Sequence, residues 1–138
     1  MIALLDTHIL LWWLEDRDHL SPREREVIDA AHADEPLYLA DITLWEIATL
    51  HELGRIKLNL PLRDWLERAT SPPLVKRVSV TPAIAAEVAS LPSSFHRDPA
   101  DRIIVASARV LGATLVTRDR KILDAKIVPT LEKPQEHA

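Results

Sequence analysis

Residues 99–117 read PADRIIVASARVLGATLVT and hold the most informative pattern in the chain. A proline opens the segment, and the apolar residues that follow predict a deeply buried helix over Pro99–Leu111. Gly112 stands where this helix should end, because glycine readily adopts the left-handed backbone of a helix terminus. Thr114–Thr117 is then predicted to be a short strand. A helix that leads into a buried strand is typical of a parallel sheet with helices on its faces.

The same alternation of strands and helices extends outward from this segment. Ile2–Leu5 is wholly apolar, as expected for a strand buried on both faces of a parallel sheet. Further strands are predicted at Leu37–Ala40, Val75–Val80 and near Ile127–Val128, and further helices at Thr7–Glu15, Pro22 to about His32, Thr43–Leu53, Leu62–Ala69, Pro82 to about Leu91 and Arg120–Asp124. These βαβ units predict a three-layer α/β fold with a central, mainly parallel sheet flanked by helices.

Length and composition suit one compact domain. The chain has 138 residues, of which 47% are hydrophobic and 28% are charged, so a substantial core can form. We assign this domain to residues 1–130 and expect residues 131–138 to be a frayed C-terminal tail. No apolar run approaches the roughly 20 residues that span a bilayer. The N-terminus also lacks a basic leader, so we expect a cytoplasmic protein with no membrane attachment.

The residue types that are rare or missing exclude several functional classes. The chain has no cysteine, which excludes a disulfide framework, a thiolate zinc finger, an iron–sulfur cluster and a cysteine nucleophile. It has only two glycines, so a P-loop and a Rossmann glycine fingerprint are absent. The six histidines show no helical pair spacing such as i, i+4, which argues against a zinc site.

The net charge of −4 divides unevenly along the chain. Residues 1–69 hold 7 basic and 14 acidic side chains, whereas residues 70–138 hold 10 basic and 7 acidic ones. Neither half has the strong positive charge that marks a typical nucleic-acid-binding surface. If the partner is a polyanion, something other than bulk charge must attract it.

Five acidic residues occupy equivalent places relative to the predicted elements. Asp6 follows the first strand, and Glu46 lies in the first turn of the helix after the second strand. Asp98 and Asp101 open the helix before the last main strand, and Asp119 follows that strand. Ligand crevices in open parallel sheets form at the edge where the carboxyl ends of the strands meet. The pattern therefore predicts that the five carboxylates meet in one cleft.

Most of these acids also have a simpler interpretation as helix caps. Asp6, Asp98 and Asp119 each precede a predicted helix, where a side-chain oxygen can accept hydrogen bonds from backbone N–H groups. Thr43 and Glu46 have the spacing of a capping box. Each cap is credible by itself, so the direction of the side chains has to decide.

Direction favours a metal site for two of the acids. Glu46 and Asp101 are each in line with apolar residues at i+4 and i+7, so their side chains should point inward. Carboxylates at the edge of a core are costly unless they are paired, protonated or bound to a cation, and crowded carboxylates raise one another's pKa. A hard divalent cation is the simplest remedy. The all-oxygen ligand set favours Mg²⁺ or Mn²⁺ over zinc.

Several basic residues flank the predicted cleft. A solvated surface is the usual meaning of such side chains, and their second interpretation is contact with the phosphates of a polyanion. The candidates for that contact are His96, Arg97, Arg102 and Arg118.

Four segments together resemble a known family. They are LLDTHILLW at residues 4–12, TLWEIA at 43–48, DPADRIIVA at 98–106 and LVTRD at 115–119. In this order they resemble the signature segments of PIN-domain ribonucleases, and the match is closest to the VapC-like toxins of bacterial type II toxin–antitoxin pairs. The resemblance covers roughly residues 1–130. One departure is Ala100, where family members often carry a bulkier apolar residue, and it leaves the acidic set complete.

The resemblance implies a nuclease with a four-carboxylate site. It gives the catalytic and metal-binding roles to Asp6, Glu46, Asp101 and Asp119, with Thr7, Thr43, Asp98 and Thr117 in support. One or two Mg²⁺ ions, with Mn²⁺ as a substitute, would be held chiefly by Asp6 and Asp101. They would activate water for hydrolysis of RNA to a 5′-phosphate and a 3′-hydroxyl.

The resemblance also implies protein partners. VapC-like proteins are usually homodimers and are silenced by a small antitoxin whose tail covers the acidic cleft. The apolar excess of the helices at Thr7–Glu15 and Thr43–Leu53 would suit such contacts, although core packing explains it as well.

Three other functional classes compete with the nuclease. A receiver-type phospho-acceptor domain needs paired acids after the first strand and a late lysine, but Asp6 stands alone before Thr7 and His8. A haloacid-dehalogenase-type phosphatase needs a second aspartate at the place of His8. A catalytically silent PIN-fold interaction module is the remaining alternative, and the complete acid set argues against it.

Overall fold

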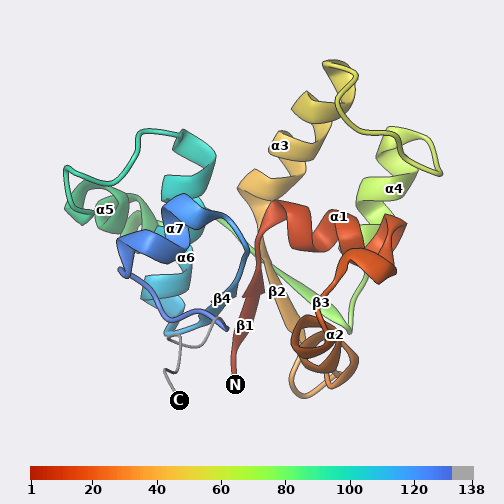
Figure 1. Ribbon diagram of the computed structural model, residues 1–138, viewed down its shortest axis with the longest axis horizontal. Helices are drawn as coiled ribbons and strands as arrows, with labels where there is room; N and C mark the ends of the chain where they lie inside the picture. Colours follow the sequence, from red (N-terminus) through yellow and green to blue (C-terminus); the bar gives the residue numbers. More distant parts are fainter. Residues whose placement is uncertain (132–138) are drawn as a thin grey trace, which may run out of the picture.

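The computed structural model describes residues 1–131, so the predicted tail beyond Leu131 lies outside the described residues. Within that range the chain forms one sheet of four parallel strands in the order β3-β2-β1-β4 (Figure 1). The strands are β1 (Ala3–Leu5), β2 (Leu37–Ala40), β3 (Val75–Val78) and β4 (Thr114–Val116). The predicted α/β fold with a parallel sheet is confirmed.

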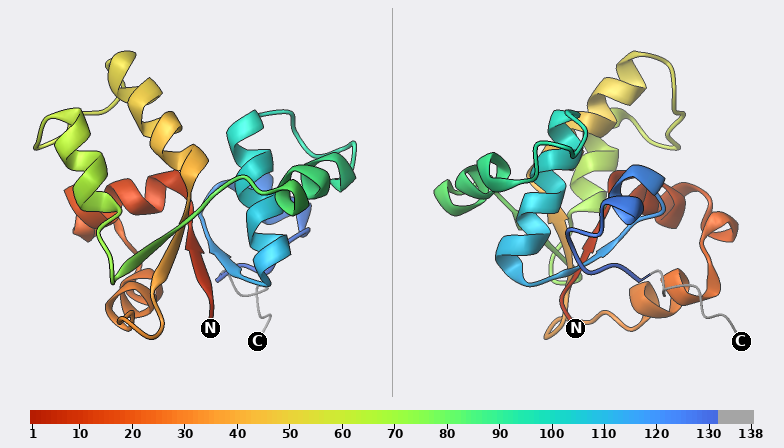
Figure 2. Two further views of the ribbon diagram at one scale, coloured as in Figure 1. Left: turned by 180° about the vertical axis from the view of Figure 1, so that it is seen from behind. Right: turned by 60° about the vertical axis from the view of Figure 1, so that its left-hand side comes forward.

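The helices lie on both sides of this sheet. They are α1 (Thr7–Glu15), α2 (Pro22–Asp29), α3 (Asp41–Glu52), α4 (Leu62–Ala69), α5 (Pro82–Ser90), α6 (Pro99–Leu111) and α7 (Arg120–Ala125), with a short 3-10 helix, η1 (Arg17–His19), between α1 and α2. Figures 1 and 2 show α1 to α4 on one side and α5 to α7 on the other. None of the helices within residues 1–131 is long and apolar enough to cross a membrane.

Each face of the sheet has its own hydrophobic core, because successive side chains of a strand point to opposite faces. Ala3 and Leu5 of β1 pack with α1, α2, α3 and α4, whereas Leu4 packs with α6 and α7. We call the core with α1 to α4 the first core and the core with α6 and α7 the second core. In β2, Leu39 belongs to the first core and Ala40 to the second core. The sheet is therefore buried on both faces, as its wholly apolar first strand predicts.

Several predicted helix ends are confirmed by their capping groups. Ser21 and Glu24 form the capping box that opens α2, and the Thr81 hydroxyl accepts a hydrogen bond from the backbone at the start of α5. At the end of α6, Gly112 has a φ of 65°, the left-handed conformation that glycine adopts without a steric penalty. The abrupt end of α6 lets the chain turn directly into β4.

Several predicted boundaries are wrong, and β3 ends at Val78, two residues before the predicted Val80. Helix α2 ends at Asp29 and not near His32, and α3 begins at Asp41, two residues before the predicted start at Thr43. Residues 127–128 form no strand; only one parallel bridge, between Leu115 and Thr130, extends the sheet there. Proline at position 129 has no backbone N–H to donate to a ladder, which limits this edge to a single bridge.

Candidate metal centre

The carboxyl ends of the strands border an open pocket of about 300 Å³. The five acids that the sequence analysis places in one cleft all line it. They come from the ends of β1 and β4, from α3 and from the start of α6. The lining residues are Asp6, His8, Glu46, His96, Asp98, Asp101, Asp119 and Lys121.

Asp6 both caps a helix and faces the pocket. Its Oδ1 accepts a hydrogen bond from the backbone N–H of Thr7 at 2.8 Å, and its Oδ2 accepts one from the Thr117 hydroxyl at 2.6 Å. The residue is only 5% exposed, and this burial raises the pKa of its carboxyl group. The two hydrogen bonds fix the orientation of the carboxylate, so the cap and the site depend on the same geometry.

Glu46 lies in the second turn of α3, not in the first turn as predicted, because the helix begins at Asp41. Thr43 is therefore a buried residue within α3 and not its N-cap, so Thr43 and Glu46 do not form a capping box. Instead the Thr7 hydroxyl contacts both the Thr43 hydroxyl, at 3.1 Å, and the Glu46 carboxylate. Burial raises the pKa of Glu46, and the charge of Asp6 adds to the rise. The predicted inward direction of Glu46 is confirmed.

Asp98 and Asp101 stand together at the start of α6. The Asp98 side chain caps the helix by accepting a hydrogen bond from the backbone N–H of Asp101 at 3.0 Å. The Asp101 side chain is 13% exposed. Burial raises its pKa to about 8, and the neighbouring carboxylates, first among them Asp6, contribute to the rise. At neutral pH a metal-free pocket would thus retain a proton on Asp101.

Three of these carboxylates are close enough to share a cation. Glu46, Asp98 and Asp101 each offer one oxygen atom, and these atoms all lie within 4.8 Å of one another. Oxygen ligands of this kind fit Mg²⁺ or Mn²⁺. The expected role of Asp6 as a chief ligand with Asp98 in support stays a prediction, and Asp98 is the one of the two that belongs to this group. Both Asp6 oxygens already accept hydrogen bonds, whereas Asp98 is exposed towards the pocket.

Thr117 links Asp6 to the other end of the pocket. Its hydroxyl oxygen accepts a hydrogen bond from the backbone N–H of Asp119 at 3.1 Å while it donates to Asp6. Asp119 in turn caps α7 by accepting a hydrogen bond from the backbone N–H of Lys121 at 2.9 Å. The loop from Thr117 to Asp119 therefore supplies one carboxylate to the pocket and orients another.

His96 is a basic residue in direct contact with one of the acids. Its Nε2 is 3.2 Å from an Asp101 carboxylate oxygen, and this buried nitrogen has no hydrogen-bond partner within residues 1–131. Two further residues line the pocket. Lys121 flanks Asp119 and is a candidate phosphate contact by its place in the sequence, whereas His8 was missed. His8 lies two residues after the capping Asp6, in the first turn of α1, and this spacing is the signal that could have identified it.

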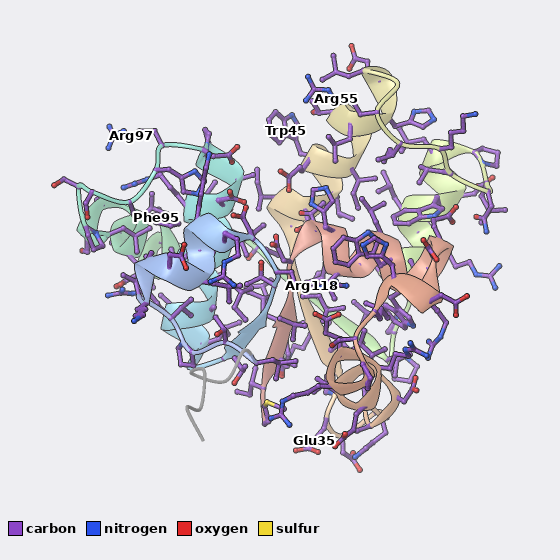
Figure 3. The ribbon with its side chains drawn as sticks, viewed as in Figure 1. Glu35, Trp45, Arg55, Phe95, Arg97 and Arg118 are labelled. Carbon is purple, nitrogen blue, oxygen red and sulfur yellow. The ribbon has the colours of Figure 1, made fainter. Side chains whose placement is uncertain are left out.

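The three predicted arginine contacts differ in their surroundings. Arg97 is exposed on the loop before α6, and in Figure 3 it points away from the body of the molecule. Arg102 instead turns back on its own chain, where its guanidinium donates to three backbone carbonyls of the segment before α6. Arg118 forms an ion pair with Glu24 at 3.1 Å. Of the three, only Arg97 presents an uncommitted guanidinium in the described part of the chain.

Comparisons with known proteins agree with this fold. Residues 3–128 match the profile of a family described as PIN domain. The chain is 43% identical to Ribonuclease VapC22 of Mycobacterium tuberculosis over 120 residues, which are 87% of this chain and 88% of that protein.

Two solved structures show the same architecture. VapBC2 from Rickettsia felis, bound to a DNA fragment from the promoter, is similar with a TM-score of 0.70 at 16% identity, over 94% of this chain and 97% of that one. FitAcB from Neisseria gonorrhoeae is similar with a TM-score of 0.65 at 25% identity, over 95% of this chain and 97% of that one.

Proposed function

Since the chain belongs to the PIN domain family, we propose that it is a Mg²⁺-dependent endoribonuclease. The observation that carries the proposal is the cluster of Glu46, Asp98 and Asp101, whose oxygen atoms lie within 4.8 Å of one another in a pocket at the carboxyl edge of the sheet. The 43% identity to a protein named as a ribonuclease supports RNA as the substrate.

The pocket residues fit a divalent cation by their chemistry. Glu46, Asp98 and Asp101 would hold it, and Asp6 and Asp119 would complete its surroundings directly or through water. A bound Mg²⁺ lowers the pKa of a water ligand and polarises the scissile phosphate. Thr7 and Thr43 keep Glu46 in place, and Thr117 does the same for Asp6. The chain thus supplies a site in which every acid either faces the cation or is oriented by a neighbour.

The cation would also reduce the repulsion between the acidic pocket and the phosphates of an RNA substrate. An acidic pocket repels the phosphates of RNA until positive charge fills it, and the same carboxylates, after burial, help to raise the pKa of Asp101. Metal binding would displace the proton of Asp101. His96 beside Asp101 and Arg97 on the adjoining loop are the side chains that we propose to contact the RNA.

The test is cleavage of total RNA by the purified protein with and without Mg²⁺, followed by mapping of the new ends. We expect Mg²⁺-dependent cleavage that leaves 5′-phosphates. Asp6→Asn and Asp101→Asn should each reduce it at least about 100-fold, because changes outside the ligand set alone cost about 10- to 100-fold. Asp29→Asn is the matched control, since Asp29 is an exposed acid of α2 outside the pocket. Absence of cleavage with both Mg²⁺ and Mn²⁺ would favour a catalytically silent interaction module.

We further propose that the protein is the toxin of a type II toxin–antitoxin pair and acts in the cytoplasm. The likeness to VapBC2 and to a toxin–antitoxin complex from Klebsiella pneumoniae supports an antitoxin partner. Expression of this chain alone should arrest bacterial growth, and co-expression of the small open reading frame beside its gene should restore growth. Failure of that rescue would contradict the toxin role and leave the nuclease activity standing.

A homodimer is the second proposed assembly. Trp45 on α3 is 58% exposed, Leu53 directly after α3 is 59% exposed, and Val80 beyond the end of β3 is also exposed. A contiguous exposed apolar patch marks a protein contact surface, and we propose that these side chains contribute to one. Light scattering of the purified chain should give the mass of a dimer, and a Trp45→Ser variant should shift it towards the monomer.

A further inference from the structure

We propose that Arg118 is a positioning residue, which holds the loop that orients Asp6 and Asp119 and does not itself contact RNA. The inference rests on the proposed nuclease function, which it deepens by assigning a residue outside the metal pocket. It also replaces our sequence-based interpretation of Arg118 as a candidate phosphate contact.

The Arg118 guanidinium contacts three segments that lie outside the loop of residues 117–119. Its Nε lies 3.1 Å from a carboxylate oxygen of Glu24 in α2, and its terminal nitrogen donates to the backbone carbonyl of His19 in η1. The centre of the guanidinium lies 4.2 Å from the ring centroid of Trp12 in α1. Figure 3 places Arg118 beside α1 at the middle of the molecule. The side chain is therefore bound to α1, η1 and α2 at once.

Glu24 is a firm anchor for this contact. It is one of the few buried charged residues in the described part of the chain, and its second oxygen accepts a hydrogen bond from the Ser21 backbone N–H at 2.8 Å. Trp12 is also fixed, since it stacks on the His19 ring at 4.2 Å between centroids. A buried carboxylate with one oxygen in a helix cap needs a cation for the other oxygen, and Arg118 is that cation.

The backbone of Arg118 transmits this anchoring to the pocket. Arg118 lies between Thr117, whose hydroxyl donates to Asp6 at 2.6 Å, and Asp119, whose N–H donates back to that hydroxyl at 3.1 Å. A loop pinned at its middle residue keeps both hydrogen bonds aligned. Release of the guanidinium would free the loop, and the carboxylates of Asp6 and Asp119 would lose their fixed orientation.

The two roles of Arg118 predict different measurements. A phosphate contact would raise KM and reduce the salt dependence of RNA binding when the charge is removed, with little effect on the catalytic step. A positioning residue would lower kcat and weaken Mn²⁺ binding by about tenfold, since groups that orient metal ligands typically matter by 10- to 100-fold. It would leave KM and the salt dependence unchanged.

The experiment compares Arg118→Gln with Arg109→Gln as the matched control. Arg109 also pairs with a carboxylate, that of Glu87 at 2.7 Å, and donates to a backbone carbonyl, but it lies at the other end of α6. We would measure kcat and KM on RNA, Mn²⁺ affinity, and hydrogen exchange of the Asp119 and Lys121 amides in the metal-free protein. We expect faster exchange at both amides, a lower kcat and weaker Mn²⁺ binding in Arg118→Gln only.

A double variant separates positioning from simple loss of stability. Arg118→Gln leaves Glu24 as an unpaired buried charge, and adding Glu24→Gln removes that charge while keeping a side chain that can form the capping box. We expect the double variant to recover thermal stability but not kcat or Mn²⁺ affinity. Recovery of kcat together with stability, or a change in KM alone, would overturn the proposal. If the unmodified protein neither binds Mn²⁺ nor cleaves RNA, the proposed function fails, while the exchange measurement still tests the anchoring of the loop.

Discussion

Burial of the Asp101 side chain, together with the charges of four neighbouring carboxylates, raises its pKa from 3.8 to about 8. In the unfolded chain the same group ionises near its ordinary value. Between these two pH values the folded protein binds a proton that the unfolded chain has lost. The free energy of unfolding must then fall as the pH rises through this window, because stability rises with pH only where the unfolded state holds more protons.

We predict that metal-free protein loses stability between pH 5 and pH 8, and that Asp101→Asn reduces this loss. The amide has nearly the same shape as the carboxyl group but never ionises. Asp6 and Glu46, whose pKa values are also raised, should maintain part of the slope. Urea denaturation in EDTA at several pH values measures the effect. Asp29→Asn should keep the slope of the unmodified protein, and an equal slope in Asp101→Asn would contradict the prediction.

The start of α6 has two tasks: it caps the helix, and it carries two of the candidate metal ligands. Asp98 caps the helix and also belongs to the cluster that can hold a cation. Three residues later, Asp101 points into the pocket while Val105 and Ala108 on the same side are fully buried. The start of α6 therefore combines a local requirement, the cap, with a requirement of the site, the negative charge.

Substitutions of Asp98 should separate these two roles. Asp98→Asn keeps an oxygen that can cap the helix but removes the charge, so we expect Mg²⁺ affinity to fall about tenfold or more with little change in stability. Asp98→Ala should lose the same affinity and also about 1 kcal/mol of stability. Thr81→Ala, which removes the cap of α5, is the control that should lose stability alone. Calorimetric titration with Mg²⁺ and urea denaturation give the two quantities.

At the scale of the whole molecule, the site joins elements that pack in different cores. Glu46 is carried by α3, whose Ile47 packs in the first core, whereas Asp101 is carried by α6, which packs in the second. A cation held by both would connect the two faces of the sheet. Because a ligand that binds only the folded state stabilises it, metal binding should raise the stability of the entire chain.

We predict that Mg²⁺ raises the Tm of the protein. At a concentration roughly 100 times its Kd, binding adds about 2.7 kcal/mol, which for a chain of this length corresponds to roughly 10 °C. Asp101→Asn should show a much smaller rise under the same conditions. Thermal unfolding followed by circular dichroism with and without Mg²⁺ tests this, and an equal rise in the variant would show that the ion acts elsewhere.

Patterns within single elements were the part of the structure that sequence analysis recovered well. The bounds of α1 and α4 were predicted to the residue, since apolar spacing and end signals are local properties of the chain. The start of α3 was not, because Thr43 and Glu46 imitate a capping box while the real helix begins directly after β2 without a side-chain cap. No local signal likewise shows that the Arg102 guanidinium binds the carbonyls of Phe95 in the preceding loop and of Val88 in α5.

The order of apolar and acidic residues along the chain was enough to predict a parallel α/β sheet and an acidic cleft at its carboxyl edge, because both follow from periodicity and from the topology that βαβ units impose. The positions of the individual side chains within the cleft depended on three-dimensional packing. Packing brings oxygen atoms of Glu46, Asp98 and Asp101 within 4.8 Å of one another. It also places the Thr117 hydroxyl on Asp6, a residue 111 positions away in the chain. Distances of that kind are set only when the two cores pack against the sheet.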